Sequence, residues 1–191
     1  LRLAGEAQKM LDGSIALSST IPITPYEGNF REYISQCETR TGWRSGNALT
    51  LNTSAQKRGA ACLQSTGSNA DEFRRKFSMP FAAGSSTSIG FWYFISDVKT
   101  CASDNQVELG SGGAADVNEY NWTLDTASLK NGWNYIKLDF ADATVTGGEP
   151  NMAELNWFRI YRSKNGTVTT MIDDIKFRGA GGIQTPVADA G

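Results

Sequence analysis

The chain has 191 residues, of which 40% are hydrophobic and 20% charged, and its formal net charge is −2. This length allows one domain with a buried core, and the composition is that of a globular rather than a disordered protein. The sequence contains no basic block that would favour nucleic acid as the main partner, and no apolar run approaches the ~20 residues that cross a membrane. It also contains no histidine, which excludes Ser-His-Asp and Cys-His hydrolase sites and zinc sites that use histidine.

The chain begins with an extension, residues 1–29, that we expect to be a linker. It contains one candidate short helix, Glu6–Leu11, followed by a stretch with Pro22 and Pro25 that is typical of an extended tether. Its first 17 residues lack the basic head and the long apolar stretch of a secretory signal, and we expect a longer protein upstream.

Short β-rich runs separated by Gly, Ser, Asn and Asp fill the centre of the sequence, and several of them alternate between apolar and polar residues. In chain order the predicted strands are Tyr33–Glu38, Ala48–Asn52, Ala60–Gln64, Phe73–Phe77, Ser88–Ser96, Gln106–Gly110, Glu119–Leu124, Asn134–Phe140, Trp157–Arg162 and Thr167–Phe177. Regularly spaced strands of this kind predict an all-β protein, specifically a β-sandwich (jelly roll) of two antiparallel sheets over residues 30–178. Residues 179–191 then begin with a glycine-rich linker.

The three cysteines are Cys37, Cys62 and Cys101, an odd number without the short spacing of a metal site. Cys37 and Cys62 lie on strands that we expect to be neighbours, which makes them the pair that would form a disulfide in an oxidising compartment. The alternative is three small buried side chains that form no bond.

Six motifs follow one another along the predicted strands: Ile34-Ser35-Gln36-Cys37-Glu38, Gly42-Trp43, Lys57-Arg58-Gly59-Ala60-Ala61-Cys62-Leu63, Phe91-Trp92-Tyr93-Phe94, Gly132-Trp133-Asn134-Tyr135-Ile136 and Ile172-Asp173-Asp174-Ile175-Lys176-Phe177. In this order and spacing they resemble the jelly-roll carbohydrate-binding modules that have a structural calcium ion, similar to the family four, six and twenty-two modules. The last seven residues, 185–191, resemble the opening of a PKD domain, a spacer of secreted bacterial polysaccharide-active proteins. The resemblance implies a secreted or cell-surface bacterial protein in which this module targets a linked polysaccharide-degrading enzyme to its glycan, with no nucleic-acid partner and no membrane insertion.

A calcium site is expected where the first and last strands meet. Gln36 and Glu38 share one face of the first strand, and on the last strand we expect Asp173 to share a face with the core residues Ile175 and Phe177. A carboxylate aimed at a core needs a matched charge, and a hard cation with six to eight oxygen ligands would supply it. By resemblance, backbone carbonyls near Lys57 complete the shell, whereas Asp174 points away. The alternative is that the two aspartates cap a turn or form surface ion pairs.

A carbohydrate surface is expected on the outward side of the strands, because sugar rings bind aromatic side chains and groups that donate and accept hydrogen bonds. Alternation directs the following residues outward, Asn121 on condition that Tyr120 and Trp122 turn inward: Trp92, Glu108, Asn121, Tyr135, Lys137, Trp157, Arg159 and Tyr161. If their strands share one sheet, these residues form one aromatic and charged surface. Lys137 and Arg159 would suit uronate or sulfate groups. The alternative is that loops cover Trp92 or Trp157.

The basic run Arg74-Arg75-Lys76 has two interpretations, a solvated strand face or a surface that binds an anionic polymer.

We do not expect an enzyme. The sequence lacks the Glu-x-Asp-x-x-Glu run of concanavalin-like glycosidases and the histidine of alginate-type lyases. Two alternatives to a carbohydrate-binding module stay open: an adhesion or spacer sandwich, whose aromatic side chains would be covered, and a fragment of a jelly-roll glycoside hydrolase or polysaccharide lyase.

Overall fold

The computed structural model describes residues 31–179, and the expectations for residues 1–29 and 180–191, including the short helix at Glu6–Leu11, lie outside this range. Its strands are β1 (Tyr33–Ser35), β2 (Trp43–Arg44), β3 (Ala48–Asn52), β4 (Cys62–Gly67), β5 (Phe73–Phe81), β6 (Ser88–Ile95), β7 (Cys101–Gly110), β8 (Glu119–Thr123), β9 (Gly132–Asp139), β10 (Thr144–Thr146), β11 (Leu155–Lys164) and β12 (Val168–Arg178). Three single-turn 3₁₀ helices connect them: η1 (Val98–Thr100), η2 (Thr126–Ser128) and η3 (Phe140–Asp142). No helix within the described range is long and apolar enough to span a membrane.

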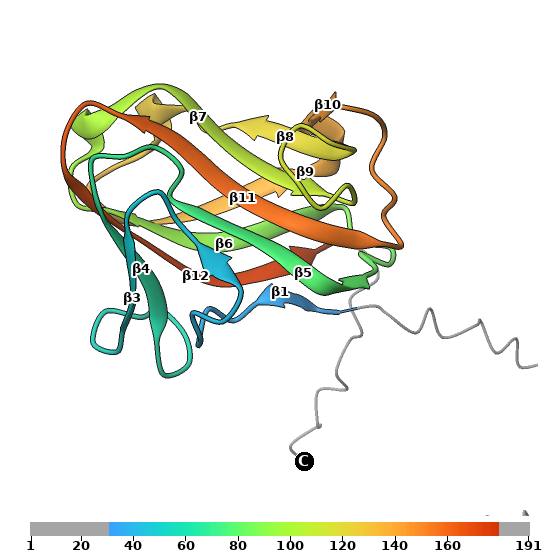
Figure 1. Ribbon diagram of the computed structural model, residues 1–191, viewed down its shortest axis with the longest axis horizontal. Coiled ribbons are helices and arrows are strands. Elements are labelled where there is room, and N and C mark those ends of the chain that lie inside the picture. Colours follow the sequence, from blue (N-terminus) through green and yellow to red (C-terminus); the bar gives the residue numbers. More distant parts are fainter. Residues whose placement is uncertain (1–30, 180–191) are drawn as a thin grey trace, which may run out of the picture.

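The strands form two antiparallel six-stranded sheets that pack face to face (Figure 1). The β12 sheet has the order β3-β4-β12-β6-β9, with β1 also paired to β12, and the β11 sheet has the order β10-β8-β7-β11-β5-β2. The prediction of an all-β sandwich is therefore confirmed. All ten predicted strands are present, and β1 pairs with β12, so the expected meeting of the first and last strands is also confirmed.

The core lies between the sheets and consists of the inward residues of both, as alternation predicts. On β6 the side chains of Phe91 and Tyr93 are fully buried, and on β11 Phe158 and Ile160 are fully buried. The rings of Phe91 and Phe158 meet edge to face across the interface, with centroids 6.2 Å apart. These contacts fix which side of each strand faces outward, and so they position any surface site.

A β-bulge interrupts β12 and overturns one expectation. Asp173 pairs with Trp92, whereas Lys176 pairs with Gly90, so β12 has one residue more than β6 over this stretch. Asp174 adopts a positive φ of 54°, a conformation that aspartate tolerates better than most residues. As a result Asp173 lies on the outward side with Trp92, not on the inward side with Ile175.

One buried group of charged residues lies beside the core. The Glu72 carboxylate forms an ion pair with Arg162 at 2.8 Å, Lys164 lies 3.6 Å away, and all three side chains are at most 1% exposed. Tyr93 donates its hydroxyl hydrogen to Glu72, and Arg162 contacts the Cys101 sulfur. Because a lone buried charge is costly, each of these groups depends on the others.

Candidate functional site

The outward residues predicted from the sequence do not share one sheet. Trp92, Tyr135 and Lys137 lie on β6 and β9 of the β12 sheet. The other five lie on the β11 sheet: Glu108 on β7, Asn121 on β8, and Trp157, Arg159 and Tyr161 on β11. Alternation assigns a residue to one side of its strand, but the two sheets of a sandwich have their outward sides on opposite faces of the molecule. The expected single surface is therefore two surfaces.

The outer face of the β11 sheet is organised around Glu108. Its carboxylate is fully buried and accepts a hydrogen bond from the indole Nε1 of Trp157 at 3.1 Å. Arg159 donates to the same carboxylate from Nε at 2.9 Å and from its terminal nitrogen at 2.5 Å. Charge-assisted bonds of this kind hold both side chains in one orientation. The result is a pre-ordered set of an aromatic and a guanidinium group.

Two further residues extend this face. Asn121 is the cross-strand neighbour of Glu108, and its amide donates to Gln106 Oε1 at 3.3 Å. Tyr161 is half-buried, and the Arg159 guanidinium lies over its ring, 4.9 Å from the centroid. Trp122, the neighbour of Asn121 in sequence, faces the core and confirms the expected outward direction of Asn121. Donors, acceptors and an aromatic ring therefore stand together on one face.

Glu119 lies beneath this face, on β8 next to Asn121. It is fully buried, and neither of its carboxylate oxygens accepts a hydrogen bond of ordinary geometry from another residue in the range 31–179. Burial, and next to it the Glu108 carboxylate, raise the pKa of Glu119 to about 7, and the Asp116 backbone and the Asn121 side chain oppose this shift only in part. Glu119 is therefore largely protonated below neutral pH.

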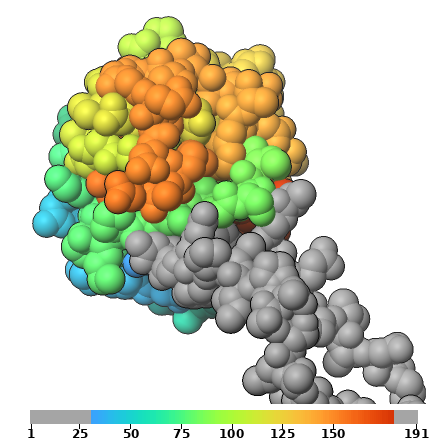
Figure 2. Space-filling model, turned by 90° about the vertical axis from the view of Figure 1, so that its right-hand side faces the viewer, coloured from blue at the N-terminus to red at the C-terminus, as the bar shows by residue number. Residues whose placement is uncertain are grey.

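Loops close one end of the sandwich next to the face. Ser111 accepts a hydrogen bond from the backbone N–H of Asn151 at 2.9 Å, and Asn118 donates its backbone N–H to Gly147 at 3.3 Å. Figure 2 shows the yellow-green and orange segments that contain these loops lying against each other. Trp157 is only 8% exposed, so only a small part of its ring is open to a ligand.

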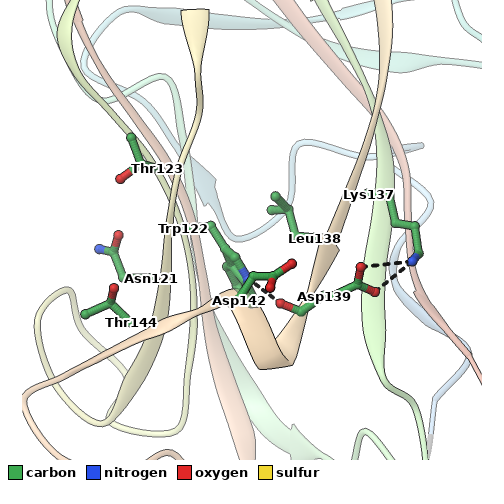
Figure 3. Close-up of a pocket in the computed structure, with 8 residues that line it drawn as sticks. All are labelled: Asn121, Trp122, Thr123, Lys137, Leu138, Asp139, Asp142 and Thr144. Atoms are coloured by element: carbon green, nitrogen blue, oxygen red, sulfur yellow. Dashed lines mark hydrogen bonds and ion pairs between the residues drawn. The ribbon is translucent and has the colours of Figure 1, made fainter. Parts of the chain in front are cut away.

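A polar pocket of about 290 Å³ lies where β8 and β10 approach β9. In Figure 3, Asn121, Thr123 and Thr144 lie on one side, and Lys137 and Asp139 form an ion pair on the other, at 2.7 Å. The pocket brings together Asn121 and Lys137. Alternation predicted both on the outward face of a single sheet, whereas here they come from different sheets and line one pocket at the edge of the sandwich. It continues the hydrogen-bonding character of the β11 face toward the edge of the sandwich.

The outer face of the β12 sheet is aromatic but partly covered. The rings of Trp92 and Tyr135 meet edge to face at 5.1 Å, and Tyr135 is 43% exposed. The loop between β3 and β4 lies over this face: the Lys57 ammonium is 4.3 Å from the centroid of Trp92, and Trp133 donates its indole hydrogen to the Ala55 carbonyl at 3.1 Å. This loop reduces the area that a ligand could contact.

The β3–β4 loop also donates hydrogen bonds to the acidic residues that were expected to bind a metal. Asp173 Oδ2 accepts backbone hydrogen bonds from Lys57 at 2.7 Å and Arg58 at 2.9 Å, and Glu38 accepts one from Ala60 at 2.9 Å. Backbone N–H groups, not the expected carbonyl oxygens, therefore point at these carboxylates. Burial raises the pKa of Asp173, and the two N–H donors lower it in part. Asp173 Oδ1 is buried and has no hydrogen-bond partner in the part of the chain that the structure describes.

A pocket of about 320 Å³ lies beside these carboxylates, lined by Gln36, Glu38 and Asp174 among others. Asp174 was expected to point away from Gln36 and Glu38, but the bulge turns it toward them, and Lys176 Nζ lies 3.5 Å from its Oδ2. Among residues 31–179, no three His, Cys, Asp or Glu side chains form a cluster suited to a metal ion. A metal at this position would therefore need amide or backbone oxygens as well.

All three cysteines are free thiols, so the expected Cys37–Cys62 bond is absent. The alternative of three small buried side chains holds for Cys37 and Cys62, whereas Cys101 is half-buried. Cys62 Sγ lies 3.7 Å from the sulfur of Met171, and Cys37 Sγ lies 3.9 Å from the Ser35 carbonyl. Burial raises the pKa of Cys62 to about 12, which keeps its thiol protonated and unreactive.

The β11 face also contains residues that the sequence interpretation did not place there. Gln106 and Glu119 are the main examples, and Arg44 and Arg74 lie on the same side of β2 and β5. The outward position of Gln106 could have been predicted, because Gln106 lies two residues before Glu108 on the same strand. The outward position of Arg44 could not, because a strand of two residues is too short to show alternation.

Comparison with known proteins shows a shared fold without detectable sequence kinship. No family model matches the sequence, and no curated protein matches it. The structure is similar to the family 11 carbohydrate-binding module from Clostridium thermocellum in complex with a β-1,3-1,4-mixed-linked tetrasaccharide, with a TM-score of 0.54, 11% identity, and coverage of 78% of this chain and 95% of that chain. It is also similar to the family 11 module of a cellulosomal cellulase of the same organism (TM-score 0.52, 11% identity, 78% and 94% covered). The fold is thus the β-sandwich seen in these carbohydrate-binding modules.

Proposed function

We propose that this chain is a non-catalytic carbohydrate-binding module that directs a linked polysaccharide-degrading enzyme to its glycan. The observation that carries the proposal is the Glu108-centred set on the outer β11 face, in which Trp157 and Arg159 are held in fixed orientations. Fixed donors bind a ligand at a lower entropic cost than mobile ones. The sandwich fold it shares with carbohydrate-binding modules supports the proposal.

The ligand surface in this proposal runs along the β11 face from Trp157 and Tyr161 to Asn121. Tyr161 supplies an apolar ring face for the C–H groups of a sugar, and the amides of Gln106 and Asn121 bind its hydroxyl groups. The opposite face, with Trp92, Tyr135 and Lys137, is the second choice because the β3–β4 loop covers part of it.

A glycosidase is disfavoured although the face contains a pair of acidic residues. Glu108 and Glu119 lie on adjacent strands, and two carboxyl groups at short range are what a glycosidase requires. Both are fully buried, and Glu108 is already bonded to Arg159 and Trp157. A carboxyl group that the scissile bond cannot reach cannot protonate it.

An affinity gel with cellulose, xylan, β-glucans, alginate, agar and carrageenan tests the proposal directly. We expect the chain to be retained by at least one polysaccharide and the retention to be lost in Tyr161→Ala but kept in Tyr135→Ala, the matched aromatic change on the other face. Loss in Tyr135→Ala alone moves the site to the β12 sheet. Retention by none of the glycans refutes the function, and release of reducing ends or unsaturated products refutes the absence of catalysis.

We also propose that Glu38 and Asp173 hold a structural calcium ion, with the Gln36 amide oxygen and the Lys57 carbonyl as further ligands. Two observations support the fit: Asp173 Oδ1 is buried without a partner among the described residues, and Gly59 packs so closely on Glu38 that a Cβ there would meet its carboxylate. Asp174, which lines the pocket with Glu38, is an additional oxygen donor. Calcium accepts such oxygen ligands and would stabilise the fold by binding only the folded state.

A thermal melt tests the calcium proposal. We expect EGTA to lower the melting temperature, added calcium to restore it, and Asp173→Asn to abolish the response. A melt that EGTA does not change refutes the proposal and leaves the backbone N–H groups as the only partners of these carboxylates.

The wider setting is also part of the proposal. A secreted or cell-surface bacterial location, and linkage through residues 179–191 to a PKD-like domain, are supported by the sequence resemblance of residues 185–191. Detection of the full-length protein in the culture medium, with this segment continuing into a further domain, is the expected result.

A further inference from the structure

Basic side chains line up on the outer β11 face. The strand register pairs Arg44 of β2 with Arg74 of β5, and Arg74 in turn with Arg159 of β11. Adjacent strands are ~4.8 Å apart, so this row of three guanidinium groups spans about 10 Å across the sheet. Lys76 lies on the same side of β5, opposite Trp157, and we count it with the three arginines as a member of this row.

The charges of this row are only partly balanced. Arg74 forms an ion pair with Asp71, and Arg159 forms one with Glu108. Arg44 and Lys76 are exposed, and neither forms an ion pair within residues 31–179. Asp71 and Glu108 are themselves buried, so their negative charges lie beneath the surface while positive groups stand above it. These four basic residues therefore outnumber their two carboxylate partners, although the chain as a whole has a net charge of −2.

Like charges directly opposite each other on neighbouring strands destabilise a sheet. Lys137, the other cation that the sequence suggested for acidic sugars, lies on the opposite sheet and is paired with Asp139. The basic run Arg74-Arg75-Lys76 accordingly contributes two of its members, Arg74 and Lys76, to the β11 face. Arg75 turns to the other side, where its guanidinium lies 4.6 Å from the centroid of the Phe77 ring.

We infer that the glycan bound by this face is acidic, with carboxylate or sulfate groups that bind Arg44 and Lys76 while its sugar rings contact Tyr161 and the edge of Trp157. Guanidinium groups suit both anions because they offer paired donors in a planar fork. The inference rests on the proposed function and narrows it to one substrate class. It also accounts for the position of Arg44 and Lys76, which form no ion pair within residues 31–179, on the same face as Trp157 and Tyr161.

The test compares acidic and neutral glycans by isothermal titration. The acidic probes are polygalacturonate, whose charge is carboxylate, and carrageenan, whose charge is sulfate; the neutral probes are fully methyl-esterified polygalacturonate, xylan and β-glucan. We expect binding to an acidic probe that weakens steeply with added salt. The double variant Arg44→Gln/Lys76→Gln should weaken it about tenfold or more for each lost charged bond, whereas Lys130→Gln, an exposed lysine outside the row, should not. Circular dichroism of each variant verifies folding.

The two acidic probes separate the source of the charge, and binding of either one supports the inference. Equal binding of neutral and acidic probes without a salt effect overturns it while the carbohydrate-binding function stands. Unchanged affinity in the double variant also overturns it. If no probe of either charge binds, and the polysaccharide gel retains nothing, the proposed function itself fails.

Discussion

Replacing Glu119 by glutamine should make the stability of the sandwich less dependent on pH. In the folded chain burial and the Glu108 carboxylate raise the pKa of Glu119 from 4.5 to about 7. The folded state therefore binds this proton more tightly than the unfolded state does, and the free energy of unfolding falls as the pH rises from 4.5 to about 7. A pKa unit is worth about 1.4 kcal/mol, so the wild-type chain loses at most about 3 kcal/mol over this interval.

Urea unfolding of both proteins at several pH values between 4 and 8.5 measures this effect. Below pH 4.5 the two should have similar stability, because a protonated carboxyl and an amide both are neutral. Above pH 7 Glu119→Gln should be the more stable protein by up to about 3 kcal/mol. Glu154→Gln, at an exposed carboxylate, is the control and should follow the wild type. A stability difference that stays constant across the whole pH range would show that Glu119 does not titrate there.

Three further changes test other parts of the structure. Glu72→Gln should lower the free energy of unfolding by about 3 kcal/mol in a urea titration, because it leaves the buried charges of Arg162 and Lys164 without their partner; an effect below 1 kcal/mol would contradict this. Phe91→Ala should cost about 3–5 kcal/mol by the same assay, because it opens a cavity between the sheets, and an unchanged midpoint would mean that the core is not packed as described. Gly59→Ala should lower the melting temperature, because its φ of +61° and its contact with Glu38 leave no room for a side chain; a wild-type melt would show that the loop relaxes freely.

The fold could be predicted because each long strand contains a clear alternation. In β6, β7 and β11 the inward residues are apolar and the outward ones are polar or aromatic, and the structure confirms this assignment for Phe91, Leu109 and Phe158. β2 and β10 were not predicted because two or three residues contain too little of a repeating pattern.

The site was predicted less well, for two physical reasons. Alternation states which side of a strand a residue occupies but not which sheet the strand joins, so Trp92 and Trp157 were expected on one surface and lie on two. On β12 a single extra residue at Asp174 reversed the alternation after Asp173. A one-residue shift exchanges the two faces of a strand, and the doublet Asp173-Asp174 was the only local sign of it.

The buried carboxylate of Glu108 links the stability of this sandwich to its binding surface. The Glu108–Arg159 pair is weak evidence for stability, because the cost of taking two charges out of water can exceed the gain from pairing them, and buried ion pairs can often be replaced by apolar residues without loss of stability. Its position is better explained by what it orders, since it fixes both the indole of Trp157 and the guanidinium of Arg159 on an open face. Glu119 beside it would add a second negative charge, but burial keeps that group largely protonated below neutral pH. Glu108 thus holds Arg159, as Asp71 holds Arg74, while the neighbouring Arg44 and Lys76 form no ion pair within residues 31–179 and are left to an incoming ligand.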